Sequence, residues 1–399
     1  MLYIAGISLA FFLSFLLISK KNKSFADKIL FVWLLVIGTH LGFFYLSFTG
    51  RLYEYPFLIG LQFPFPLLHG PFLYLYAAAI TNRLPKQRSL IWIHFIPVVI
   101  VYLWLIPFMS MPAEEKISIF QSKGKGHETF LLLLLVSIIV SGFGYIVWTR
   151  SILKKHKRTI LNQFSNTDKI NLDWLNYLMY CIAIIWIIVL SGNDEFTFTA
   201  SVFFIGFIGY FGIKQVGIFT QQQQFTVRDN GDTVSLNNNE NFSANEGMGI
   251  PESITEGGSI EETFDKSSGG RRKYSKSGLS SEAANDLHQK LRHLVNIDKV
   301  YKDSELTLTE LAKKLNTHPN YLSQIINDRE GKNFYDFINT LRTEEFKRLI
   351  SNPGNQKFTL LGLANECGFN SKSSFNKYFR KTTGQSPSEY LEQLGVKDV

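Results

Sequence analysis

The chain has 399 residues, of which 46% are hydrophobic and 35 are phenylalanine, and its formal net charge is +8. This length allows two or three domains, and a mean hydropathy of +0.04 averages parts of unlike character. The two cysteines, Cys181 and Cys367, fall in an apolar and a polar part of the chain, which argues against a disulfide or a cysteine metal site.

Seven apolar segments precede residue 219, and each has about the 20 residues that a helix needs to cross a bilayer. Their ranges are about 2–19, 28–49, 56–80, 91–110, 129–148, 174–191 and 197–218. A buried helix of a soluble protein is usually shorter, and it is not repeated seven times between charged loops. The sequence therefore predicts a seven-helix transmembrane bundle over residues 1–218.

The loops between these segments alternate in charge. The first, third and fifth loops are basic, and they hold Lys20, Lys21 and Lys23, then Arg83, Lys86 and Arg88, then Arg150, Lys154, Lys155, Lys157, Arg158 and Lys169. The other loops are nearly neutral, balanced in sign or without basic residues. Because basic loops remain in the cytoplasm, the pattern predicts an N-terminus outside and a C-terminal part in the cytoplasm. The first segment has no basic stretch before it, which favours a retained helix over a cleaved signal peptide.

Few polar side chains interrupt the apolar segments. Gln62, His69 and His94 are the candidates for intramembrane sensing, and His40 is a further polar residue of this kind. Ionisable groups in lipid usually face the interior of a helix bundle. Hydrogen bonding between helices is the simpler explanation for each of them taken singly.

The third apolar segment is rich in prolines around His69. Pro64, Pro66 and Pro71 should break or kink a helix and free backbone carbonyl groups. A kinked helix beside His69 would be suited to line a ligand cavity.

Residues 219–280 differ sharply from the apolar segments. They are rich in Gln, Asn, Ser, Gly and Glu, and nine acidic residues but no Lys or Arg lie between Arg228 and Lys266. Such a composition cannot bury enough apolar surface to offset the entropy of ordering the chain. We expect a disordered, acidic linker that anionic lipid and DNA both repel.

Two similar helix pairs are predicted in residues 281–399. In the first, at about 307–330, Thr307 and Glu310 form a capping box, and Pro319 suits the first position of a second helix. In the second, at about 359–381, Gly368 supplies the turn and Ser371 is a good N-cap. Two short helices joined by a tight turn are typical of a helix-turn-helix motif.

The second helix of each pair has a polar stripe opposite its apolar face. The stripes are Asn320, Ser323, Gln324 and Asn327 in the first pair, and Lys372, Ser373, Asn376, Lys377 and Arg380 in the second. Amide and basic side chains hydrogen-bond to adenine and guanine edges in the major groove. A solvated helix face would explain one such stripe, but two of them, each after a capped helix and a turn, favour DNA binding.

Residues 283–395 resemble the AraC-type DNA-binding domain of bacterial transcription regulators. The signature is carried by Ala364, Gly368-Phe369, Ser371, Phe375, Phe379, Lys381, Gly384, Ser386-Pro387 and Tyr390. The resemblance implies two recognition helices in successive major-groove segments about one helical turn apart. It also implies base-reading roles at Asn320, Ser323 and Gln324 and at Lys372, Ser373, Asn376 and Lys377. Gln324 stands where an arginine is common in this family, and His318 where a serine cap is common.

The whole layout is similar to the membrane-bound AraC-type regulators of Bacteroidota. We expect an all-α protein of the bacterial inner membrane that couples a membrane or extracytoplasmic signal to transcription. Double-stranded DNA and the bilayer are the expected partners, and RNA polymerase, a small-molecule signal and a second copy of the chain are further candidates. No metal, cofactor or enzymatic activity is expected, because the sequence lacks zinc-helix, nucleophile-elbow and phosphate-loop motifs. The alternative is a membrane receptor or transporter whose C-terminal domain docks a protein partner.

Overall fold

A computed structural model describes residues 1–168, 170–211, 280–355 and 357–393, which fall into two compact units. Unit 1 comprises Met1–Ile160 and Ile170–Gly217, and unit 2 comprises Leu161–Lys169 and Ile218–Val399. In the described residues the regular elements are all helices, and the antiparallel bridge between Phe164 and Thr307 belongs to no strand. The predicted all-helical class is confirmed, while nearly all of the predicted linker lies outside the described residues.

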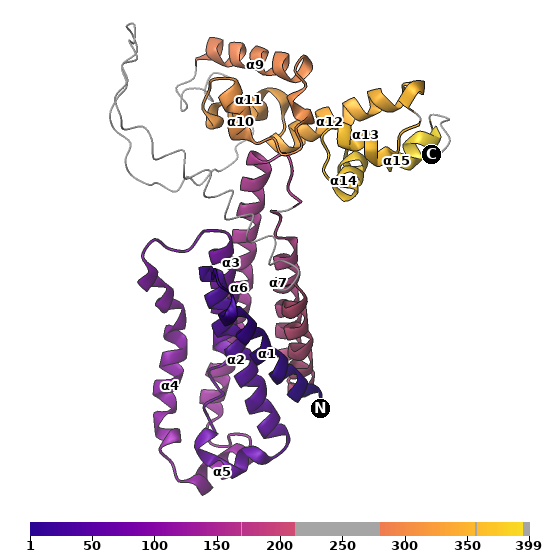
Figure 1. The fold of residues 1–399 in the computed structure, drawn as a ribbon. Coiled ribbons are helices and arrows are strands. Elements are labelled where there is room, and N and C mark those ends of the chain that lie inside the picture. The colour runs from indigo at the N-terminus through magenta and orange to yellow at the C-terminus, as the bar shows by residue number, and fades with distance from the viewer. Residues whose placement is uncertain (169, 212–279, 356, 394–399) are drawn as a thin grey trace. The chain divides into compact units, whose positions relative to one another are not determined.

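Unit 1 is a set of helices that run roughly along a common direction (Figure 1). They are α1 (Leu2–Ser19), α2 (Phe25–Phe48), α3 (Pro66–Ile80), α4 (Ile96–Met109), the short α5 (Ala113–Gln121), α6 (Glu128–Gln163), α7 (Asp173–Val189) and a further helix over 194–211. Three 3₁₀ helices connect them: η1 (Arg51–Glu54), η2 (Pro56–Leu58) and η3 (Arg88–Phe95). α1 packs on α2, and α2 packs on α3. The second helix therefore contacts both the first and the third.

The helices of unit 1 depart from the predicted segments in two places. The third segment is helical only from Pro66, and residues 56–65 form η2 and turns, because Pro64 and Pro66 cannot donate backbone hydrogen bonds. The fifth segment continues as helix through the basic loop as far as Gln163. Lys, Arg and Leu favour the helix there, and neither Gly nor Pro interrupts it.

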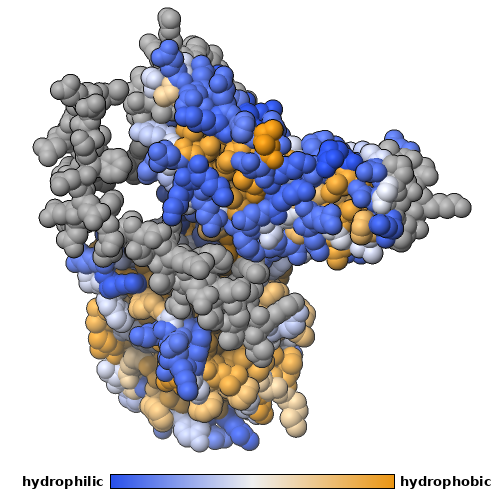
Figure 2. Space-filling view, turned by 45° about the horizontal axis from the view of Figure 1, so that its top comes forward, coloured by the Kyte–Doolittle hydropathy of each residue, from blue (hydrophilic) through white to orange (hydrophobic). Residues whose placement is uncertain are grey.

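Four helical stretches are long and apolar enough to cross a bilayer: Leu2–Ser19, Phe25–Phe48, Arg88–Met109 and Glu128–Gln163. The apolar helices Pro66–Ile80 and Asp173–Val189 are shorter. Large apolar side chains point outward from unit 1, and Trp92 is 73% exposed. Figure 2 shows apolar surface gathered over unit 1, whereas the visible face of unit 2 is mostly hydrophilic.

Unit 2 is built from short helices around α12 (Phe334–Ile350). The others are α9 (Ser281–Asn296), η4 (Val300–Lys302), α10 (Leu308–Lys314), α11 (Pro319–Glu330), η5 (Pro353–Asn355), α13 (Leu360–Glu366), α14 (Lys372–Thr383) and α15 (Pro387–Gln393). The N-terminal half of α12 packs through Phe334 and Phe337 on the α10–α11 pair. Its C-terminal half packs through Phe346 on the α13–α14 pair. One helix therefore joins two small hydrophobic cores (Figure 1).

Candidate functional site

The first helix pair, α10–α11, is fixed by caps at both of its helices. Thr307 and Glu310 form the predicted capping box, in which Glu310 N donates to Thr307 Oγ1 at 3.2 Å and Thr307 N to Glu310 Oε2 at 2.9 Å. Asn316 takes a positive φ of 48° in the turn. His318 caps α11, because its Nδ1 accepts from Asn320 N at 3.2 Å. The histidine thus performs the capping role for which a serine is common in the AraC-type domains that the sequence resembles.

The polar stripe of α11 lies opposite three fully buried side chains. Leu322, Ile325 and Ile326 are 0% exposed. Of the predicted DNA-contacting residues, Asn320 and Asn327 are exposed, whereas Ser323 and Gln324 are half-buried. Asn327 Nδ2 donates to Ser323 O at 2.8 Å, so one amide of the stripe is engaged within the helix.

The second helix pair, α13–α14, repeats this plan. Thr359 caps α13 by accepting from Gly362 N at 3.1 Å, and Ser371 caps α14 by accepting from Ser374 N at 3.2 Å. Gly368 makes the turn with a φ of 98°. The predicted stripe is exposed at each of its positions, Lys372, Ser373, Asn376, Lys377 and Arg380. Phe375 and Phe379 anchor the opposite face in the core.

The two stripes differ in charge. α14 has no acidic residue, and although Lys381 pairs with Asp336 at 2.5 Å, Lys372, Lys377 and Arg380 make no ion pair within the described part of the chain. The stripe of α11 holds only uncharged amide and hydroxyl groups. Of the two faces, α14 is therefore the more suited to phosphate, and α11 to neutral base edges.

Buried polar groups tie the segment around η4, which precedes the first helix pair, to α12. Arg342 is 1% exposed, and its Nε and Nη2 donate to the backbone oxygens of Tyr301 and Asp303, each at 2.7 Å. Burial lowers the pKa of Arg342 to about 10, so the guanidinium remains charged at neutral pH. On the same helix, hydrogen bonds from Arg348 and then from Lys299 hold the pKa of Glu345 at about 2.

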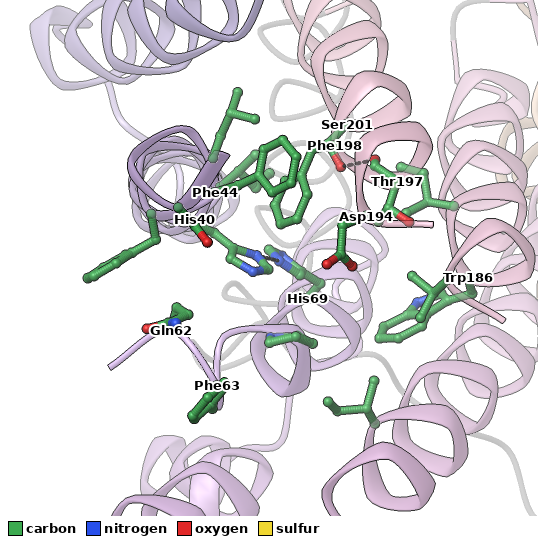
Figure 3. A pocket seen from close by; sticks show the side chains of 18 of the residues that line it. His40, Phe44, Gln62, Phe63, His69, Trp186, Asp194, Thr197, Phe198 and Ser201 are labelled. Atoms are coloured by element: carbon green, nitrogen blue, oxygen red, sulfur yellow. Dashed lines mark hydrogen bonds between the residues drawn. The ribbon is translucent and has the colours of Figure 1, made fainter. Parts of the chain in front are cut away.

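Unit 1 contains a pocket of about 380 Å³, which Figure 3 shows. α2, α3, α5, α6, α7 and the helix over 194–211 all contribute to its lining, which is mainly aromatic and aliphatic. Gln62 and His69 of the predicted sensing residues line it, together with His40 and Asp194. His94 is not among the lining residues; its Nδ1 bonds instead to the hydroxyl of Tyr145 at 2.9 Å.

The two pocket histidines, His40 and His69, are joined by a hydrogen bond whose direction is set by Trp33. Trp33 Nε1 donates to His69 Nδ1 at 3.4 Å, and His69 Nε2 lies 3.1 Å from His40 Nδ1. Since the indole can only donate, Nδ1 of a neutral His69 accepts and its Nε2 carries the proton toward His40. Figure 3 shows the two imidazoles stacked beside Asp194. The sequence alone did not predict that Asp194 and His40 line one pocket, because the pocket brings together residues from helices that are distant in the chain.

Comparison with known proteins identifies the C-terminal part. Residues 311–393 match the family model described as "Helix-turn-helix domain". Unit 2 carries a helix-turn-helix domain. This match agrees with the resemblance of the sequence to AraC-type DNA-binding domains.

Relatives match a stretch of slightly less than a quarter of this chain. The uncharacterized HTH-type transcriptional regulator YobQ of Bacillus subtilis is 35% identical over 89 residues, which are 22% of this chain and 36% of that protein. The Msm operon regulatory protein of Streptococcus mutans is 29% identical over 23% of this chain and 32% of its own length. The uncharacterized HTH-type transcriptional regulator YijO of Escherichia coli is 34% identical over 24% of this chain and 33% of its own length. The chain therefore spans about a third of the length of these relatives, and no solved structure matches it.

Proposed function

We propose that this protein is a membrane-tethered, sequence-specific DNA-binding transcription regulator. The exposed stripe of α14, with Lys372, Asn376 and Lys377 on a capped helix of a helix-turn-helix domain, is the observation that carries the proposal. α11 supplies the second recognition helix, with Asn320 and Gln324 toward base edges. Each pair then forms a helix-turn-helix unit, and the two enter successive major-groove segments.

The tether is unit 1, which we place in the bacterial inner membrane. The four long apolar helices and their outward-facing apolar side chains support this location. The alternation of basic loops supports seven spans, with the N-terminus outside and the helix-turn-helix domain in the cytoplasm. The arrangement is that of the membrane-bound AraC-type regulators of Bacteroidota. RNA polymerase and a second copy of the chain are partners to test once DNA binding is established.

Topology reporters fused after Lys23, Arg88 and Arg158 test this placement. Each fusion should report the cytoplasm, because each follows basic residues of one of the three basic loops. A periplasmic signal from any one of the three would contradict the seven-span arrangement.

The pocket of unit 1 is the place where we expect the signal to bind. Its lining is mainly aromatic and aliphatic, and among the described lining residues Asp194 is a carboxylate while none is Lys or Arg. Asp194 makes no ion pair within the described residues. A carboxylate beside aromatic faces favours a small cation with an apolar body over an anion.

Tryptophan fluorescence can test this ligand class, because Trp33 and Trp186 line the pocket. Phenethylamine should change the fluorescence of the full-length protein in nanodiscs in a saturable way, and 3-phenylpropionate should not. Asp194→Asn should abolish the amine response, whereas His94→Gln, which lies outside the lining, should retain it. Equal responses to both compounds would refute the charge preference.

DNA binding itself is tested with the full-length protein in detergent. Genomic fragments should be retained in a salt-sensitive manner, since neutralised phosphates release counterions. If the protein retains no fragment of its own genome but captures a protein partner, it is instead a membrane receptor or transporter with a docking domain.

A further inference from the structure

The DNA-binding unit contains a segment from far away in the chain. Residues 161–168, which we name the strap, end α6 and follow it, yet they belong to unit 2 rather than unit 1. Phe164 forms an antiparallel bridge with Thr307, the N-cap of α10. Ser165 N and Oγ both donate to Leu306 O, at 3.3 and 2.7 Å. The strap thus pairs with the backbone just before the first helix pair.

Ser165 fills a socket built from α12. It is 1% exposed, and its backbone oxygen accepts from Asn339 Nδ2 at 2.9 Å and from Arg342 Nη1 at 3.3 Å. Arg342 Nη2 also donates to Ser165 Oγ at 3.1 Å. A buried carbonyl that receives two side-chain donors indicates a specific seat, since buried polar groups are costly when they are unpaired.

The polar side chains of the socket have hydrogen-bond partners other than the strap. Arg342 also bonds to the backbone oxygens of Tyr301 and Asp303, and its Nη1 donates to Asn339 Oδ1 at 3.1 Å. If the strap leaves, the guanidinium keeps these acceptors, so no unpaired charge remains buried. The seat is therefore suited to a segment that can bind and leave.

The far end of the strap reaches the second recognition helix. Asp168 Oδ2 accepts from Ser371 Oγ at 2.6 Å, and Oδ1 bonds to Ser374 Oγ. Ser371 is the N-cap of α14, directly before Lys372 and Ser373. This places a carboxylate at the positive end of the helix dipole, beside side chains that we assign to DNA. A DNA phosphate that approaches this helix end meets a negative charge already seated there.

The strap also ties the two helix pairs together. It contacts Thr307 at the start of the first pair and Ser371 at the start of the second. The two recognition helices must be spaced to fit successive major-groove segments. A segment that bonds to both pairs restricts this spacing, and it is covalently continuous with α6 of unit 1.

We propose that the surface formed by Leu306, Thr307, Asn339, Arg342, Ser371 and Ser374 is an intramolecular docking site whose occupant is the strap, and that the docked strap lowers DNA affinity. Strap and DNA then exclude each other at the N-terminus of α14. By linkage, whatever draws the strap away through α6 raises DNA affinity, and bound DNA favours the released strap. This inference rests on the proposed DNA-binding function.

Removal of the strap charge is the first test, made in full-length protein reconstituted in nanodiscs. The probe is the genomic fragment that wild-type protein retains best. Asp168→Asn should tighten binding to it about tenfold, the scale expected when one charge-assisted contact is weakened. Asp173→Asn is the matched control: it removes the same charge five residues later, at the start of α7, where the ion-pair partner of Asp173 among the described residues is Lys157, at 3.8 Å. The control should bind DNA as wild type does.

A reversible lock is the second test. Residues opposite each other in an antiparallel bridge have Cα atoms about 4.5–5.5 Å apart, within the range that a disulfide spans. The double variant Phe164→Cys, Thr307→Cys should therefore bind DNA at least about tenfold more weakly when oxidised, and reductant should restore its affinity. The single variant Thr307→Cys shows the effect of the lost cap alone, and it should not respond to oxidant.

The outcomes separate the two proposals. Unchanged or weaker DNA binding by folded Asp168→Asn, or tighter binding by the oxidised lock, would overturn the inhibitory strap while leaving the DNA-binding function in place. If wild type and every variant fail to bind genomic DNA, the proposed function itself is wrong.

Discussion

Gly368 is the position at which a single methyl group should most disturb the DNA-binding unit. It takes a φ of 98°, and a Cβ there would lie 2.6 Å from Tyr301 O, 2.8 Å from Lys302 O and 2.9 Å from Arg342 Nε. Two of these neighbours are backbone atoms, which cannot rotate away. Gly384 offers a matched comparison, since its φ is 81° but a Cβ there meets nothing within 4 Å.

The loss of stability expected for an alanine at each position follows from these two environments. Either alanine adopts a left-handed conformation at a cost of about 1–2 kcal/mol. At Gly368 the Cβ must also push apart Tyr301 O and Arg342 Nε, which are joined by a 2.7 Å hydrogen bond. Loss of a buried hydrogen bond to a charged group costs about 1.5–3 kcal/mol. Gly368→Ala should therefore destabilise unit 2 by about 3–5 kcal/mol, and Gly384→Ala by about 1–2 kcal/mol.

Hydrogen exchange read by mass spectrometry on the full-length protein can measure the difference. The amides of Phe375 and Phe379 lie in α14, which Gly384 caps, and in the core that holds Cys367 and Phe369, the two neighbours of Gly368. A difference of about 2 kcal/mol corresponds to roughly thirtyfold faster exchange in Gly368→Ala than in Gly384→Ala. Equal rates in the two variants would refute the close approach of Gly368 to η4 and Arg342.

Two further predictions concern the same unit. Glu345 has its pKa held at about 2 by Arg348 and Lys299, below its unfolded value, so its charge stabilises the fold above about pH 4 and this contribution is lost as the pH falls toward 2. Glu345→Gln should therefore cost about 1–2 kcal/mol at pH 7, with a gap to wild type that closes near pH 2 in exchange experiments; a gap independent of pH would contradict the ion pair. The double variant Gln324→Ala, Lys372→Ala should lose sequence preference in a competition between specific and random DNA while α11 and α14 stay protected from exchange. A folded double variant with full specificity would remove both residues from the base-reading set.

The sequence predicted best those features that depend on neighbours in the chain. The Thr307–Glu310 capping box, the turn at Gly368 and the Ser371 cap involve residues within a few positions of one another, and each is confirmed. Helical periodicity likewise placed Phe375 inside and Lys372 outside. Local hydrogen bonding and amphipathic spacing therefore determine most of the predicted interface.

Features that depend on residues far apart in the chain could not be predicted, because no local sequence pattern indicates them. The Asp168–Ser371 contact joins positions 203 residues apart, and the His40–His69 pair joins two helices. Nothing in the local pattern around Asp168 distinguishes it from a solvated loop residue. Hydropathy also overstated the third helix and understated α6, because it measures transfer into lipid rather than the backbone restriction of proline or the helix preference of lysine and arginine.

Genome-wide mapping of the DNA bound by the full-length protein in isolated membranes tests directly whether the protein reads specific DNA sequences from the membrane. We expect discrete enriched sites for the wild type, and we expect their loss in the Gln324→Ala, Lys372→Ala variant while that variant remains in the membrane fraction. Enrichment no greater than that of random DNA, or the same sites in the variant as in the wild type, would contradict a membrane-tethered regulator that reads DNA through α11 and α14.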